Sequence, residues 1–399
     1  MSADQVKNRK PLKFLQPYID ARWGIKNHWY PALFSHEVKE DEVKGIQIAG
    51  EPVALRRADG RVYALRDECL HRGVRISARP TCFTKDTISC WYHGFTYDLE
   101  SGDLCDIIAS QEDPLIGKVS LRTYPVEEVN GMIFVFIGDE DYPRQPLAHD
   151  VPARVADDYE YRTAYLLDED TVLLGIRRHC VGNWRLATES GGDPGHFLIH
   201  RLSPLVLSQS FSLPLSARLT GPDSVIVNDK EWPKSIALDY DTLEHVMENK
   251  RLGVKTYGDT VPAGLNVSLY LPGVLYVENW PTRGLAQYEW YVPADDGHHV
   301  YWQVIAATCK TAEERQDFKV QYDNCWEELA LKSGFNDDDI FAREATEHFY
   351  EDDRGWEEET LFSLDQFVVE WRKLVINHAR GIQSPPNSHD QISAHPDGM

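Results

Sequence analysis

The sequence has no long hydrophobic run. A helix needs about 18 or more consecutive apolar residues to cross a bilayer, and the 399-residue chain contains no such stretch. The N-terminal stretch MSADQVKNRKPLKF is polar and lacks the apolar segment of a secretory signal. We therefore expect neither membrane association nor export.

Basic residues are also scarce. Lysine and arginine number 41, against 64 aspartate and glutamate residues, and the formal net charge is −23. Nucleic acids and anionic lipid surfaces both require a positively charged face on the protein. The charge balance therefore argues against nucleic acid and against a membrane surface as the main partner.

Cysteine is sparse and unevenly spaced. The seven cysteines stand at positions 69, 82, 90, 105, 180, 309 and 325. An odd, scattered set is not typical of the disulfide framework of a secreted protein. We expect a reducing, cytoplasmic location, in which cysteines that stand close to histidines become candidates for metal binding.

The apolar fraction, 42%, is sufficient for a substantial core. Residues from about 45 to 140 consist of short strand-like runs with turn signals at Ala-Asp-Gly, Ser-Gly-Asp and Asn-Gly. Later residues mix helical patterns, at 180–202 and 310–350, with strand-like runs, and the predicted fold class is α+β. The predicted segments are an N-terminal helical segment (1–27), an antiparallel β domain (28–138), a linker (139–155), a domain of helices on an antiparallel sheet (156–383) and a disordered tail (384–399).

Two short pairs, Cys69-x-His71 and Cys90-x-x-His93, form the first group of candidate ligands. Thiolates suit iron–sulfur clusters, zinc and copper(I), whereas imidazole suits zinc and iron. Common zinc fingers pair Cys with Cys and His with His, but here each loop supplies one of each. The mixed loops favour a Rieske [2Fe–2S] cluster, in which two cysteines hold one iron and two histidines hold the other. The alternatives are a structural zinc and unliganded core residues.

The second group lies in NWRLATESGGDPGHFLIH, residues 183–200. His196 and His200 are four apart, so on an α-helix they share one face and can hold one metal. A non-heme Fe(II) site needs two histidines and one carboxylate, with other positions open. Asp193 is close by, although Asp193-Pro194 also fits a helix N-cap followed by proline. The pair alone is equally compatible with a partly buried polar helix face.

The carboxylate ligand need not be local. Candidates crowd into the stretch GFNDDDIFARE, and spacing does not choose among Asp337, Asp338, Asp339 and Glu344. The structural alternative for such residues is an acidic helix start that the helix dipole stabilises.

Over nearly its whole length the chain resembles the Rieske non-heme iron ring-hydroxylating oxygenases. The resemblance is closest to the branch with carbazole 1,9a-dioxygenase and 2-oxoquinoline 8-monooxygenase. It implies a Rieske domain over 28–138 and a catalytic domain over 156–383. The segments that carry it are CLHRG…CWYHGFTYD, LPGVL, GFNDDDIFAREA, the D-x-x-H-x-x-x-H element, and the preceding residues Asn183, Trp184, Arg185 and Glu189.

The same resemblance assigns roles to individual residues. It implies a mononuclear Fe(II) held by His196, His200 and Asp339. It also implies a homotrimer, in which Asp193 links His93 of one subunit to His196 of the next and carries electrons across the subunit boundary.

The resemblance further implies a substrate pocket, although ordinary core packing is the alternative for each residue in it. The chain departs from the family pattern at Ser190 and Gly192, and the long stretch over 156–180 departs from the short connection expected there. The implied pocket residues are Gly191, Val267, Trp280, Gln287 and Phe335.

The implied function is that of the terminal oxygenase component of a multicomponent system. Electrons pass from NAD(P)H through a ferredoxin reductase and a ferredoxin, and O2 is used to hydroxylate an aromatic or heteroaromatic, carbazole-like substrate. The alternative is a monooxygenase or oxidative demethylase with the same two iron centres. Two interpretations from other classes are a Rieske electron carrier, which needs no His196/His200 pair, and a zinc-stabilised binding module, which is colourless.

Overall fold

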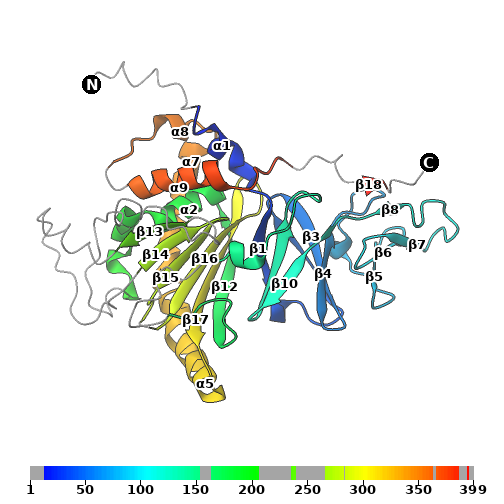
Figure 1. Cartoon of the computed structure of the whole chain (residues 1–399), viewed down its shortest axis with the longest axis horizontal. Helices are drawn as coiled ribbons and strands as arrows, with labels where there is room; N and C mark the ends of the chain where they lie inside the picture. Colours follow the sequence, from blue (N-terminus) through cyan, green and yellow to red (C-terminus); the bar gives the residue numbers. More distant parts are fainter. Residues whose placement is uncertain are drawn as a thin grey trace, which may run out of the picture. The chain divides into compact units, whose positions relative to one another are not determined.

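The computed structural model describes residues 13–152, 163–205, 235–239, 266–282, 284–362, 365–385 and 393–394. The chain forms two compact units: residues 26–144 with 383–399, here called the β unit, and residues 1–25 with 145–382, here called the helix–sheet unit. The prediction of an α+β protein, with an antiparallel β domain followed by helices on an antiparallel sheet, is confirmed (Figure 1).

The β unit is built from small antiparallel sheets, with strand orders β1-β11-β10, β2-β3-β4-β9, β5-β6-β7 and β18-β8. Its strands are β1 (His28–Phe34), β2 (Val43–Ile48), β3 (Glu51–Ala58), β4 (Arg61–Arg66), β5 (Thr87–Ser89), β6 (Phe95–Asp98), β7 (Leu104–Ile107), β8 (Val119–Ser120), β9 (Thr123–Tyr124), β10 (Val126–Val129), β11 (Met132–Ile137) and β18 (Ser393–Ala394).

The hairpin turns form where the sequence places them. β3 and β4 are joined by Asp59 and Gly60, with φ of 50° and 77°, and β10 and β11 by Asn130 and Gly131, with φ of 46° and 83°. Two successive residues with positive φ match the twist of a tight antiparallel hairpin, and Asp, Asn and Gly adopt that conformation readily. The turn chemistry therefore fixes the register of these strands.

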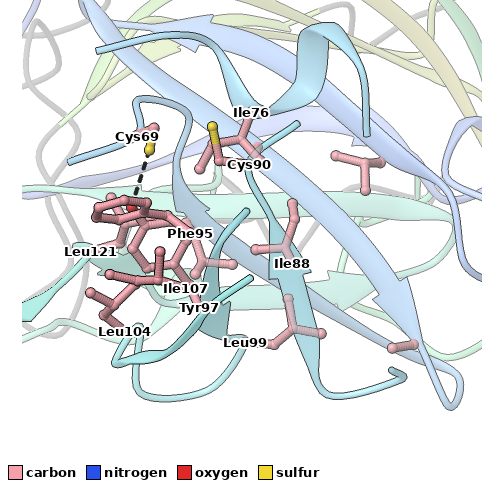
Figure 2. Packing of buried hydrophobic residues seen from close by; sticks show 14 residues of the cluster. Cys69, Ile76, Ile88, Cys90, Phe95, Tyr97, Leu99, Leu104, Ile107 and Leu121 are labelled. Atoms are coloured by element: carbon pink, nitrogen blue, oxygen red, sulfur yellow. Dashed lines mark hydrogen bonds between the residues drawn. The ribbon is translucent and has the colours of Figure 1, made fainter. Parts of the chain in front are cut away.

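A buried apolar cluster lies next to the two Cys–His loops. Cys69 and Cys90 belong to this cluster and pack with the ring of Tyr97 and the side chains of Phe95 and Ile107 (Figure 2). Each fully buried large apolar side chain contributes roughly 1.5–3 kcal/mol. The loops that carry the candidate ligands are thus supported by a packed core.

The helix–sheet unit contains one antiparallel sheet of strand order β12-β17-β16-β15-β14-β13. The strands are β12 (Thr171–Val181), β13 (Ser235–Asp239), β14 (Asn266–Tyr270), β15 (Val274–Glu278), β16 (Ala286–Pro293) and β17 (His298–Thr308).

Strand β12 corrects the sequence-based interpretation of its region. We expected helix over 180–202 and an unusual connection over 156–180. Instead β12 pairs with β17 along its whole length, from Thr171 opposite Thr308 to Val181 opposite His298, and helix α2 begins only at Trp184. The long stretch therefore supplies the edge strand of the sheet.

Several helices of this unit pack against one side of its sheet. Helix α2 packs on β14, β15 and β16 and also contacts α7 and α9, and Figure 1 shows these helices together on one side of the sheet. None of the helices in the described residues is long and apolar enough to cross a membrane. The helices and 3₁₀ turns that matter below are α1 (Gln16–Asp20), η1 (Ala21–Trp23), α2 (Trp184–Gly192), η5 (Pro194–Leu202), α5 (Ala312–Gln321), α6 (Glu327–Leu329), α7 (Asn336–Tyr350), α8 (Gly355–Glu358) and α9 (Gln366–His378).

Some predicted features lie largely outside the described residues. They are the end of the linker, from residue 153, and most of the tail, of which only 384–385 and 393–394 are described.

Candidate active site

The two Cys–His loops have the same local construction. The carbonyl of Cys69 accepts a hydrogen bond from the amide of Gly73 at 2.8 Å, and that of Cys90 from the amide of Gly94 at 3.0 Å. Both glycines have positive φ, 66° and 74°, a conformation that other residues rarely adopt. The matched turns bring the side chains of the two loops together, with the Nδ1 atoms of His71 and His93 3.0 Å apart.

The two thiols interact with each other. A hydrogen bond from Cys69 lowers the pKa of Cys90 to about 6, and the same bond raises the pKa of Cys69. The backbone amides of Tyr92 and His93 also donate to Cys90 and favour its thiolate. On the other side, the Tyr97 hydroxyl lies 3.3 Å from the Cys69 sulfur.

These four side chains fit a Rieske cluster. Two buried sulfurs lie together on the core side, and two imidazoles with converging nitrogens lie on the more exposed side. That separation suits a cluster with two thiolates on one iron and two neutral imidazoles on the other. Trp91 and Tyr92, which lie between Cys90 and His93, are 38% and 49% exposed in the single chain.

In the helix–sheet unit, the Asn-Trp-Arg stretch anchors the start of α2. Asn183 caps the helix by accepting the Arg185 amide at 3.1 Å, and the Trp184 indole donates to the carbonyl of Ala21 at 2.8 Å. The Arg185 guanidinium bonds the carbonyl of Ile19. These contacts fix the start of α2 against the N-terminal segment. The C-terminal end of α2 leads into the candidate metal ligands.

Asp193 is the N-cap of the next helix, η5. The Asp193 carboxylate accepts the Gly195 amide at 2.7 Å, so the predicted N-cap is present, and Pro194 is the first helical residue. Burial raises the pKa of Asp193 to about 6. The backbone carbonyl of Asp193 accepts a bond from Nδ1 of His196. This bond directs Nε2 of His196 toward the neighbouring ligand candidates.

The helix type differs from our expectation. Residues Pro194–Leu202 form a 3₁₀ helix rather than an α-helix. In that geometry residues four apart are displaced around the helix axis, so a shared face is lost. His196 and His200 nevertheless converge, with ring planes at 83° and centroids 5.3 Å apart.

The structure brings His196, His200 and Asp339 together from two segments far apart in sequence. One ligand atom from each lies within 4.8 Å of the others. Oδ1 of Asp339 is 3.4 Å from Nε2 of each histidine, and all three side chains are largely buried. Two imidazoles and one carboxylate on one side of a common point match the ligand set of a non-heme Fe(II) site.

Electrostatics favour the metal-binding protonation states. Burial lowers the pKa of His196 to about 4, so its ring is neutral at pH 7. Burial alone would raise the pKa of Asp339, but His200 and the Arg343 guanidinium outweigh it and hold that pKa below its usual range. A neutral imidazole and an ionised carboxylate are the forms that bind a metal.

The other carboxylates of the acidic stretch lie apart from this point. Asp338 is 43% exposed and approaches Nδ1 of His200 at 3.5 Å, on the opposite side of the ring from Asp339. Asp337 pairs with Arg178. Both stand in the first turn of α7, as expected for acidic residues at a helix start.

Two of the predicted pocket residues lie beside the histidines. The Phe335 ring stacks on His200, with centroids 3.6 Å apart and planes at 12°, and Trp280 lies 5.3 Å from Phe335. Both belong to a buried apolar cluster that also includes Ile305 and Leu331. The arrangement provides flat aromatic faces next to the candidate metal position.

The other three predicted pocket residues have defined neighbours in the backbone or core. A Cβ on Gly191 would lie 1.9 Å from the Tyr291 hydroxyl, so this glycine permits close packing. Gln287 is buried and donates to Glu289 at 2.5 Å. Val267 pairs with Val277 in the sheet, and its side chain lies outside the described residues.

Three buried residues next to Asp339 were not predicted from the sequence. They are Glu289 on β16 and Asn336 and Arg343 on α7. The sequence pattern that could have indicated them is Gln287-x-Glu289 within an otherwise aromatic strand. Alternate residues of a strand face the same side of a sheet. Two polar side chains buried on one side need hydrogen-bond partners nearby.

Comparison with known proteins agrees with this geometry. Residues 28–125 match the Rieske [2Fe–2S] domain, and residues 136–383 match the family of homotrimeric ring hydroxylases. The terminal oxygenase component of carbazole 1,9a-dioxygenase from Metapseudomonas resinovorans is 40% identical over 387 residues, which cover 94% of this chain and 96% of that protein.

Two solved structures extend the likeness to three dimensions. The 2-oxoquinoline 8-monooxygenase component superimposes with a TM-score of 0.88 and 46% identity, over 97% of this chain and 93% of that one. The oxygenase in a reduced oxygenase–ferredoxin complex of carbazole 1,9a-dioxygenase gives a TM-score of 0.80 and 38% identity, over 93% and 95%. The chain therefore belongs to the homotrimeric ring hydroxylases, Rieske non-heme iron oxygenases whose two kinds of iron site match its two groups of candidate ligands.

Proposed function

We propose that this chain is a terminal oxygenase that hydroxylates a flat heteroaromatic substrate with O2. Its electrons come from NAD(P)H through a ferredoxin reductase and a ferredoxin. The observation that carries the proposal is the convergence of His196, His200 and Asp339 within 4.8 Å, beside the stacked ring of Phe335. The carbazole relative, whose oxygenase forms a complex with ferredoxin, supports the choice of electron donor.

Each group of ligands would hold its own cofactor. Cys69 and Cys90 would bind one iron of the [2Fe–2S] cluster and His71 and His93 the other, while the second group would bind one Fe(II). When bound, the cluster supplies electrons one at a time and the mononuclear iron supplies the site of O2 activation. The chain itself fixes the ligands and controls their protonation.

Asp193 has a separate proposed role between subunits. We propose that three copies assemble and that the Asp193 carboxylate of one copy bonds the partner subunit's His93, while its backbone carbonyl holds His196. The half-buried position of Asp193 and its two fixed contacts support a positioning role at the boundary. One residue would then connect the ligands of two different cofactors.

The aromatic lining indicates the substrate class. Phe335 and Trp280 offer flat apolar faces beside the ligand group, and planar rings pack well on such faces. We propose that Gly191, Val267 and Gln287 complete the pocket. Both relatives named above act on fused nitrogen heterocycles, which supports the same class here.

The reaction has three candidate outcomes. Likeness to the carbazole enzyme favours dioxygenation, and likeness to 2-oxoquinoline 8-monooxygenase favours insertion of one oxygen atom. An oxidative demethylase is a third variant with the same two iron centres. We also propose a cytoplasmic location, which the seven unpaired cysteines support.

Single-turnover product analysis tests the proposal. The purified, prereduced chain is mixed with O2 and with carbazole, dibenzofuran, indole, 2-oxoquinoline or a methoxylated aromatic. A diol from a tricyclic heteroarene supports dioxygenation, whereas a phenol indicates monooxygenation and formaldehyde indicates demethylation. Absence of any oxygenated product, from protein with both iron sites loaded, would contradict the proposed substrate class.

A further inference from the structure

A buried polar network lies directly behind Asp339, and the proposed function gives it no role. Its central members are Glu289 on β16, 4% exposed, and Asn336 at the start of α7, 1% exposed. Burial of a charged carboxylate costs free energy unless the group is well bonded. The position of Glu289 therefore needs a structural or functional reason.

Glu289 is fully engaged with neutral donors. Its Oε1 accepts bonds from the amide of Gln287 at 2.5 Å and the amide of Asn336 at 3.0 Å. Its Oε2 accepts the Tyr291 hydroxyl at 2.7 Å. A carboxylate only accepts hydrogen bonds when ionised, so it dictates that both amides turn their NH2 groups toward it.

The orientation of the Asn336 amide matters for Asp339. Nδ2 of Asn336 also donates to Oδ2 of Asp339 at 3.0 Å and lies 2.9 Å from the Tyr301 hydroxyl. The other oxygen of Asp339, Oδ1, faces both histidines and lies 3.4 Å from Nε2 of each. The two oxygens of one carboxylate are thus assigned different partners.

Arg343 balances the negative charge of the two carboxylates. Its guanidinium lies between the rings of Tyr291 and Tyr301, 4.9 Å and 4.4 Å from their centroids, and 4.0 Å from Oδ1 of Asp339. None of its side-chain nitrogens has a hydrogen-bond partner among the described residues. The cation therefore acts through its charge and ring contacts, and leaves the orientation of Asp339 to Asn336.

We propose that Asn336, oriented by Glu289, is a positioning residue that restricts Asp339 to binding iron through Oδ1 alone. This inference rests on the proposed mononuclear iron site. When the Asn336 amide occupies Oδ2, Asp339 would take up one coordination position of the iron. A carboxylate that binds through both oxygens would take up two, so one more position stays open. Partners of this kind typically change metal affinity by about 10- to 100-fold when removed.

Ferrous nitrosyl electron paramagnetic resonance tests the proposal on the full chain. Nitric oxide is added to protein with an oxidised cluster, which is diamagnetic, so the signal reports only the mononuclear iron. Asn336→Leu is expected to change the rhombicity of that signal and to speed iron loss to a chelator by about 10- to 100-fold. Glu289→Gln, which keeps the shape of the side chain, is expected to shift both readouts in the same direction by a smaller factor.

Gln303→Leu is the matched control. Gln303 is a fully buried amide on the adjacent strand β17 and bonds Arg178 and the Leu331 carbonyl. This variant is expected to keep the parent signal even if it lowers stability. A parent-like signal and chelation rate in both Asn336→Leu and Glu289→Gln would overturn the proposal; should Asn336→Leu not fold, Glu289→Gln decides alone. A parent chain that binds no mononuclear iron would instead refute the proposed function itself.

Discussion

Removal of the Arg372 guanidinium is predicted to destabilise the helix that precedes the iron ligands. Arg372 on α9 forms two bonds with Glu189 on α2, at 2.7 Å and 2.9 Å, and also bonds Glu359. Arg372 and Glu189 are 3% and 7% exposed. Helix α2 ends next to Asp193. The ion pair therefore holds in place the segment that leads to the candidate iron ligands.

The expected magnitude follows from the burial of the pair. Arg372→Met leaves the Glu189 carboxylate buried without its partner, and loss of one member of a buried pair costs about 3–5 kcal/mol. For a unit of this size each kcal/mol corresponds to roughly 2–4 °C in Tm. The apolar part of methionine retains packing on Trp356, whose ring lies 5.0 Å from the guanidinium carbon, so most of the loss arises from charge.

Thermal and denaturant unfolding of the cofactor-loaded protein measure this effect. The matched control is Arg354→Met, because Arg354 pairs with Glu358 at 3.6 Å with both side chains more than half exposed. An exposed pair contributes about 0–1 kcal/mol. The double variant Arg372→Met/Glu189→Met removes the orphaned charge and is expected to regain part of the loss. Equal stability of Arg372→Met and Arg354→Met would show that the buried ion pair contributes no more than an exposed one.

Three further substitutions probe separate parts of the site. Cys90→Ala is expected to abolish the Rieske absorption and resonance signals; a variant that retains them would show that Cys90 is no ligand. Asp193→Asn keeps the size of the side chain and is expected to retain both kinds of iron while turnover falls to near zero, so normal activity would contradict the bridging role. Gly191→Ala places a Cβ 1.9 Å from the Tyr291 hydroxyl and is expected to cost about 1–3 kcal/mol, measured by denaturant unfolding, whereas Gly297→Ala, whose Cβ meets nothing closer than 3.9 Å, is the control that should change little.

Local sequence patterns predicted the features that depend on local chemistry. Asn130-Gly131 and Asp59-Gly60 form the expected turns, because positive φ selects those residue types. Asp193 caps the following helix, as Asp before Pro indicates. The choice of Asp339 came from family resemblance alone, and the structure places that residue, rather than Asp337, beside both histidines.

Features that depend on distant partners were not predicted. Strand β12 contains no strong alternation, and its partner β17 lies more than a hundred residues later, so nothing within residues 171–181 marks it as an edge strand. The 3₁₀ form of Pro194–Leu202 likewise depends on the packing around it, which overrides a spacing that suits an α-helix.

The network behind Asp339 shows the same limit. Glu289 appears in the sequence as one acidic residue in an aromatic strand. Its burial is explained by Gln287 and Tyr291 on the same strand and by Asn336 on helix α7, which all donate hydrogen bonds to it. A buried ion is tolerated because several separate segments satisfy it together. No single segment carries that information.

The central claim is that His196, His200 and Asp339 hold one iron in addition to the cluster. Iron and acid-labile sulfide analysis of the wild-type chain and of Asp339→Ala tests it most directly. The variant is expected to lose the one iron beyond the two of the cluster and to keep its sulfide and Rieske spectrum. Full retention of that iron in Asp339→Ala would show that Asp339 is not a ligand of the mononuclear iron.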